Sequence, residues 1–133
     1  MSDKFDIHRV YSYWLEESQE SLQVADHLFE KEDYSYALFF GHLAIEKLLK
    51  AIYVQKKGEH APLIHNLLRL ARLAGIEIES SMAEDLALIT SFNIESRYPD
   101  LKRSFRKKCT KGYSTHQMGT IKDIVKWLKS QTK

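Results

Sequence analysis

The alternation of apolar and polar positions is most distinctive between Asp33 and Gln55. Apolar residues recur there three and four positions apart, and alanines with further aliphatic residues fill most of the remaining positions. This spacing is typical of a helix, and a helix that is apolar on nearly every side has to be surrounded by protein. We therefore predict that this segment forms the central helix of the fold and ends near Lys56.

Three polar residues interrupt the central helix at intervals of four. His42, Glu46 and Lys50 would form one narrow polar line along an otherwise apolar rod. Two interpretations stay open: a ladder within the helix in which Glu46 pairs with Lys50, or a groove for a ligand or partner to which Lys47 and His65 also contribute. The same charged residues make the helix too polar to cross a bilayer.

The segment before the central helix has the pattern of a second long helix. Asp6 can cap a helix with one apolar stripe and an acidic outer face that runs to about Glu32. The connection at Glu32 and Asp33 is very short, and Asp33 is a suitable N-cap for the helix that follows. Two long amphipathic helices with a short link indicate an antiparallel hairpin.

Further helices are predicted towards the C-terminus. The apolar spacing between Leu63 and Ala74 predicts a third helix, with His65 as a candidate for capping it or satisfying backbone groups at its start. The capping boxes Ser81–Glu84 and Ser114–Gln117 are expected to open the fourth and the last helix.

The stretch between the last two helices, residues 93–113, is expected to be irregular or only partly helical. Pro99 keeps the preceding Tyr98 away from helical geometry. The pattern as a whole predicts an all-α, up-and-down bundle of four to five helices that forms one domain over residues 1–133.

Composition narrows the class of protein. Of 133 residues, 44% are hydrophobic and 29% are charged, the balance of a soluble globular domain. The single Cys109 allows neither an internal disulfide nor a thiolate metal site, so we expect a cytoplasmic protein. His60 and His65 stand five apart across Pro62, a poor chelate, and the chain carries no glycine-rich phosphate loop. No metal and no cofactor is expected.

The charges are distributed unevenly. Residues 1–33 hold nine acidic against three basic residues, a local charge of −6, and residues 77–95 hold five acidic and no Lys or Arg. Residues 97–111 hold seven basic residues against one acidic, a local charge of +6. This asymmetry indicates an anionic partner, self-association of a basic on an acidic face, or a solvated basic loop. The candidates for binding phosphate are Arg97, Tyr98, Lys102, Arg103 and Arg106.

Three blocks of the sequence resemble the HEPN domain family. Residues 37–51 (ALFFGHLAIEKLLKA) are similar to its signature helix, residues 65–70 (HNLLRL) to its third helix, and residues 93–100 (NIESRYPD) to its Arg-Tyr-Pro turn. The blocks occur in the family's order, and the resemblance spans roughly residues 8–130.

The resemblance implies a helical bundle that usually forms a homodimer. It also implies frequent pairing with a small, separately encoded nucleotidyltransferase in operons of toxin–antitoxin type. Many members of the family are metal-independent ribonucleases, and others have been proposed to bind nucleotides or RNA without cutting them.

The ribonuclease branch of the family carries an Arg followed, after four to six residues, by a His. No arginine of this chain meets that requirement; after Arg97, the corresponding positions are Lys102, Arg103 and Ser104. Metal-free cleavage needs a group that moves the 2′-hydroxyl proton and a cation that stabilises the phosphorane. We therefore expect a non-catalytic nucleotide- or RNA-binding homodimer. The alternative is a ribonuclease toxin whose Arg97 works with a distant residue, His116 or His42.

Overall fold

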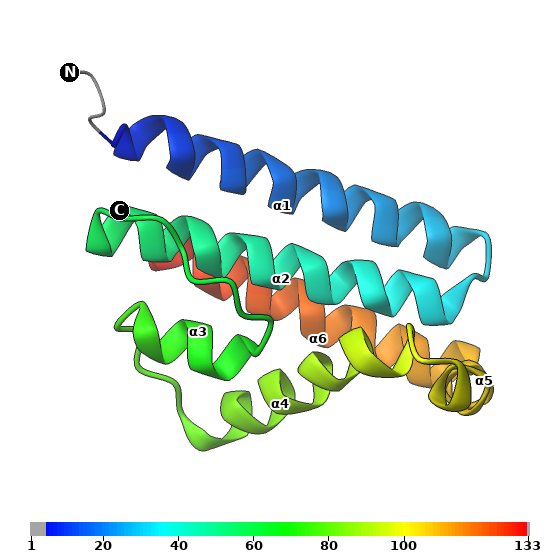
Figure 1. Ribbon diagram of the computed structural model, residues 1–133. Helices are drawn as coiled ribbons and strands as arrows, with labels where there is room; N and C mark the ends of the chain where they lie inside the picture. Colours follow the sequence, from blue (N-terminus) through cyan, green and yellow to red (C-terminus); the bar gives the residue numbers. More distant parts are fainter. Residues whose placement is uncertain (1–4, 133) are drawn as a thin grey trace.

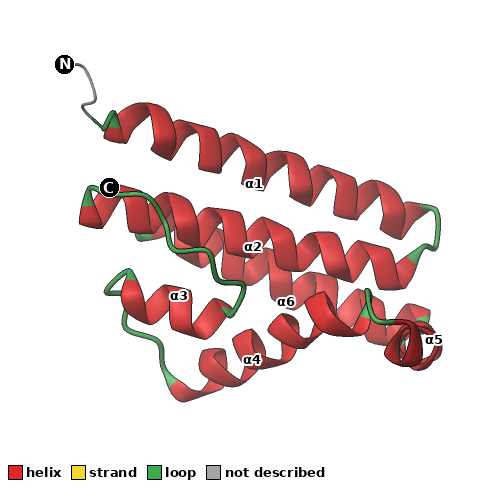
Figure 2. Ribbon diagram, in the orientation of Figure 1, coloured by secondary structure: helices red, strands yellow, loops and turns green. Residues whose placement is uncertain are grey.

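The computed structural model describes residues 5–132, and within that range the chain forms six helices and no strand (Figures 1 and 2). The predicted all-α bundle is confirmed, with one helix more than the four to five expected. The helices are α1 (Ile7–Glu30), α2 (Tyr34–Lys57), α3 (Leu67–Leu73), α4 (Ser80–Glu95), α5 (Pro99–Lys108) and α6 (Lys111–Ser130).

Helix α2 is the centre of the bundle, as its apolar pattern predicts. It contacts each of the other five helices. Figure 1 shows α1 antiparallel along one side of α2, α3 and α4 on the other side, and α5 across one end of the bundle. Leu38, Ile45, Leu48, Leu49 and Ile52 are fully buried. Burial of each such side chain contributes about 1.5–3 kcal/mol.

The turn between α1 and α2 is a Schellman motif. The Asp33 N–H donates to the Leu28 carbonyl (2.8 Å) and the Glu32 N–H to the Phe29 carbonyl (3.0 Å), which satisfies carbonyls at the end of α1. Glu32 takes a left-handed backbone with φ of 65°. Asp33 is the N-cap of α2, yet its side chain makes no capping hydrogen bond.

Helix α2 ends as its sequence predicts, at a glycine. Gly58 has a φ of 69° and donates its N–H to the Val54 carbonyl (2.9 Å). Glycine is also needed at Gly41, where α6 packs closely on α2. A Cβ on Gly41 would lie 2.6 Å from Ile121 Cδ1.

The predicted start of α3 at Leu63 is wrong. The helix begins at Leu67, and Leu63 lies in the preceding loop with 94% of its surface exposed. The cap is Asn66, whose side chain accepts a hydrogen bond from the Arg69 N–H (3.0 Å). His65 does not cap the helix because its side chain and its carbonyl are engaged with α2.

The predicted capping boxes are displaced from the true helix starts. Helix α4 begins at Ser80 after Glu79, and the Ser81 hydroxyl donates to the Glu79 carboxylate (3.2 Å) instead of capping. Helix α6 begins one turn before Ser114, where the Thr110 side chain accepts from the Tyr113 N–H (3.2 Å). A threonine one turn earlier offers the same oxygen, which leaves Ser114 to be buried inside the helix.

The segment expected to be irregular contains α5. Pro99 occupies the first turn of this helix, where proline is favoured because its missing N–H would have no partner there. Phe105 is 1% exposed, and its ring centroid lies 5.4 Å from that of Phe92 on α4. This contact anchors α5 to the bundle.

None of the helices over residues 5–132 is both long and apolar enough to span a membrane.

Candidate functional site

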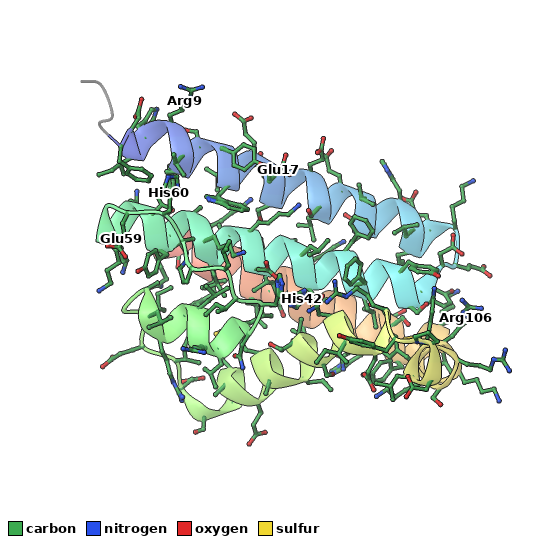
Figure 3. All side chains as sticks on the ribbon, in the orientation of Figure 1. Arg9, Glu17, His42, Glu59, His60 and Arg106 are labelled. Carbon is green, nitrogen blue, oxygen red and sulfur yellow. The ribbon has the colours of Figure 1, made fainter. Side chains whose placement is uncertain are left out.

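The polar line on α2 is a buried ladder. His42, Glu46 and Lys50 are 0%, 5% and 5% exposed, and Figure 3 shows His42 in the middle of the bundle. The Lys50 ammonium donates to Glu46 Oε2 (3.0 Å), which confirms the predicted pairing within the helix. Lys50 Nζ also lies 5.2 Å from the ring centroid of Trp14, so the ladder reaches α1.

The ladder also holds the loop between α2 and α3. His65 Nδ1 lies 3.1 Å from both carboxylate oxygens of Glu46, and His42 Nε2 lies 3.2 Å from the His65 carbonyl oxygen. The side chain of His65 is 57% exposed, and it is the part of this cluster open to solvent. Two contacts between α2 and His65 thus fix the path of the loop across the central helix.

The electrostatic surroundings keep His42 neutral. Burial lowers its pKa, and this effect outweighs the hydrogen bond with the His65 carbonyl and the charge of Glu46, which raise it. The charges of His65 and Arg97 lower the pKa further. A neutral His42 with its proton on Nε2 donates to the His65 carbonyl. Its Nδ1 has no hydrogen-bond partner within residues 5–132.

Lys47, which the sequence groups with the ladder, lies on another side of α2. Its ammonium contacts Glu17 (3.4 Å) and donates to the Ser21 hydroxyl (3.1 Å), both on α1. Lys47 therefore joins the two helices of the hairpin, and the structure does not bring it together with His42 and His65.

The basic segment is presented by α5. Because Phe105 points into the bundle, the charged residues cover the rest of the helix, and Arg103 and Lys107 are exposed. Of the α5 cations, only Lys108 forms an ion pair within the described part of the chain, with Glu95 (3.7 Å). The cations left unpaired on this helix are Lys102, Arg103, Arg106 and Lys107.

Two of these cations turn towards the start of α2. Lys102 Nζ lies 5.4 Å from the ring centroid of Tyr36, and polar contact with Lys102 is the main cause that lowers the pKa of Tyr36. The charges of Lys102 and Arg106 act in the same direction, against a smaller effect of desolvation. The i, i+4 spacing of Lys102 and Arg106 would indicate this arrangement once α5 is known to be helical.

A cleft of 360 Å³ opens beside these cations, and we call it the turn cleft. The sequence did not indicate it, because its walls come from segments about seventy residues apart in the chain. Its lining residues are Glu32, Asp33, Tyr34, Ser35, Tyr36, Arg106 and Cys109. Figure 3 shows Arg106 at this end of the molecule. Burial raises the pKa of Cys109 to about 11, so the thiol is an uncharged part of the wall.

Arg97 and Tyr98 lie between the buried ladder and α5. Arg97 is exposed, and its Nε donates to the Asn93 carbonyl (3.1 Å), while Tyr98 caps α5 and is 52% exposed. His116 is exposed on α6, and neither a hydrogen bond nor an ion pair joins it to Arg97 over residues 5–132. Of the two histidines considered as partners of Arg97, the one that its charge affects is His42.

Comparisons with known proteins agree with this architecture. The model of the HEPN domain family matches residues 11–131. The crystal structure of TT1696 from Thermus thermophilus is similar over 90% of this chain and 96% of that chain, with a TM-score of 0.77 and 21% sequence identity, a likeness of fold alone. No curated protein matches the sequence. The family match covers nearly the whole sequence, and the chain therefore belongs to the HEPN domain family.

Proposed function

We propose that this HEPN domain protein binds RNA or a ribonucleotide through α5 and does not cleave it. The observation that carries the proposal is the set of unpaired cations on α5, a helix fixed to the bundle by the buried Phe105. Like charges along one helix repel one another, and a bound polyanion relieves this repulsion. Binding would also release counterions condensed on the RNA.

The aromatic residues near α5 favour a nucleic acid over a simple anion. Tyr98 at the start of the helix is 52% exposed, and Tyr36 lies beside Lys102. Exposed aromatic rings beside cations are the elements with which proteins hold single-stranded nucleic acid. Arg97 retains guanidinium N–H groups beyond the one bonded to Asn93, and such groups suit a phosphate.

The absence of cleavage is proposed on the chemistry of the histidines. The family's Arg–His spacing is missing, and His42, whose pKa is affected by Arg97, is buried and neutral. A buried imidazole cannot reach a 2′-hydroxyl in this conformation. The alternative function is a metal-independent ribonuclease that uses Arg97 with His42 or His116. RNA cleavage that survives EDTA and is lost in His116→Ala or His42→Ala would establish that alternative.

The partners follow from family membership. We propose a homodimer that works with a small nucleotidyltransferase in a pair of toxin–antitoxin type, in the reducing cytoplasm where the free Cys109 stays a thiol. A short nucleotidyltransferase reading frame next to this gene would support the pairing. Its absence, together with failure of the two proteins to co-purify, would contradict it.

The test of RNA binding is a titration of labelled single-stranded RNA at two salt concentrations. We expect Arg103→Glu with Lys107→Glu to weaken binding strongly and to reduce the salt dependence by about 0.7 in log–log slope for each phosphate that is no longer bound. Both residues are exposed, so the melting temperature should not change. The matched control is Lys126→Glu with Lys129→Glu, the same charge change on exposed positions of α6. Equal weakening in both variants would show that net charge, and not α5, governs binding.

A further inference from the structure

The start of α2 leaves an unusual set of hydrogen-bond donors free. The N–H groups of Tyr34, Ser35 and Tyr36 have no acceptor within residues 5–132. Asp33 is placed to accept from them, but its side chain makes no capping hydrogen bond. At 24 residues, α2 has a full macrodipole, and its positive end faces the turn cleft. Free N–H groups at such an end bind anions.

A second observation at the same place points to a ligand. Ser35 is nine-tenths buried and lines the turn cleft, yet its hydroxyl makes no hydrogen bond within the described chain. A buried hydroxyl without a partner is disfavoured unless something else satisfies it. Arg106 lines the same cleft and is not ion-paired, and Lys102 stands beside Tyr36 at its edge. Together these donors match the several oxygens of a phosphate monoester.

The opposite wall of the turn cleft is acidic. Glu32 and Asp33 line it, and over residues 5–132 neither forms an ion pair, although Arg106 lines the same cleft. The two walls are therefore more than 4.0 Å apart between their charged atoms. A ligand that suits both walls has an anion at one end and hydrogen-bond donors at the other. The 2′- and 3′-hydroxyls of ribose are such donors, since carboxylates accept from them in nucleotide sites.

We propose that the turn cleft binds a 5′-phosphorylated ribonucleoside. The phosphate lies against Arg106, Ser35 and the first N–H groups of α2, and the ribose hydroxyls donate to Glu32 and Asp33. The inference rests on the proposed function, because it assigns the part of the ligand that lies beside α5. The ligand comes from one of two sources, a free ribonucleoside monophosphate or the 5′-phosphorylated end of an RNA.

The test uses AMP and 2′-deoxy-AMP as probes on the full chain, with binding followed by NMR titration. AMP should bind, and deoxy-AMP should bind about fivefold or more weakly because it lacks one donor to the carboxylates. Ser35→Ala and Arg106→Gln should each weaken AMP binding by about tenfold. Asp33→Asn with Glu32→Gln should remove the difference between the two probes. Arg103→Gln, on the outer face of the same helix, is the matched control and should leave AMP binding unchanged.

RNA oligonucleotides with a 5′-phosphate or a 5′-hydroxyl distinguish the two sources. Tighter binding of the 5′-phosphorylated RNA, lost in Ser35→Ala, supports the RNA end as ligand, whereas a response to AMP alone supports the free nucleotide. No AMP binding with no effect of the 5′-phosphate overturns the inference, as does AMP binding that Ser35→Ala and Arg106→Gln leave unchanged. RNA binding that depends only on Arg103 and Lys107 would leave the proposed function standing and overturn the turn cleft.

Discussion

At the scale of single residues, His42 occupies an unusual position for an imidazole. It has no solvent exposure, one ring nitrogen engaged by the His65 carbonyl and the other without a partner over residues 5–132. A buried polar group costs stability unless it is hydrogen-bonded. The contact with His65 offsets part of that cost, and in return it fixes the loop that leads to α3.

His42 should make stability depend on pH. Burial lowers its folded-state pKa below the ordinary 6.5, so the unfolded chain binds the proton first as the pH falls. The stability that neutral His42 contributes above this pH is therefore lost below it. We expect the free energy of unfolding, from urea titrations, to fall between about pH 7.5 and pH 5.5. The fall should be smaller in His42→Gln, in which the neighbouring Glu46, His65 and Arg97 remain. Identical pH profiles would contradict this.

Glu32 has a backbone conformation that suits glycine. Its φ of 65° is left-handed, and Gly75 occupies the equivalent position after α3 with φ of 80°. A left-handed residue with a Cβ costs about 1–2 kcal/mol. We expect Glu32→Gly to stabilise the fold by about 0.5–1 kcal/mol once the greater freedom of the unfolded glycine is counted.

Thermal melts of Glu32→Gly and Glu32→Gln check that expectation. The glutamine variant keeps the Cβ and removes only the charge, so its melting temperature should stay near that of the wild type. A lower melting temperature for Glu32→Gly would mean that the turn holds Glu32 through its side chain.

The ladder shows how far single residues could be predicted. The i, i+4 spacing alone indicates that Glu46 pairs with Lys50, because both lie on one helix face. The contact of Glu46 with His65, 19 positions away, depends on where the loop crosses α2. No local pattern encodes that path, and for the same reason Lys47 could not be separated from the ladder.

At the scale of the elements, the sequence located helix ends well where glycine stops them and less well where side chains start them. Gly58 and Gly75 end their helices because few other residues take a positive φ. Serine and threonine recur near every helix start, so Thr110 could replace Ser114 as the cap of α6. Pro99 does keep Tyr98 extended, as predicted, but an extended residue before a proline is also a suitable N-cap, and a helix follows.

The position of α5 depends on one buried ring. Phe105 is 1% exposed and packs on Phe92, whereas the neighbouring Ser104 is exposed. We expect Phe105→Ala to lower the free energy of unfolding by about 3 kcal/mol or more, to speed hydrogen exchange in α5, and to weaken RNA binding. Ser104→Ala is the control and should change none of these. A stable Phe105→Ala protein with slow exchange in α5 would show that other contacts hold the helix.

At the scale of the whole molecule, exposed large apolar side chains bear on assembly. Leu63 is 94% exposed, and Tyr13 and Ile94 are 55% and 46% exposed. Single exposed apolar residues are common, but an oligomer would bury them. Together with the tendency of HEPN-like chains to pair, they lead us to predict a homodimer. Sedimentation at micromolar concentration should give twice the chain mass of 15.6 kDa, and a monomer would contradict this.

The salt dependence of the dimer decides between two uses of α5. If the basic helix docked on the acidic α1 of a second copy, high salt would dissociate the dimer, since exposed charges are screened, and so would Arg103→Glu with Lys107→Glu. We expect neither, because α5 is proposed to be free for RNA while the dimer buries apolar surface. Sedimentation of both proteins at low and high salt, with and without RNA, is the measurement. A dimer that RNA or charge reversal on α5 converts to monomers would show that the basic helix serves self-association.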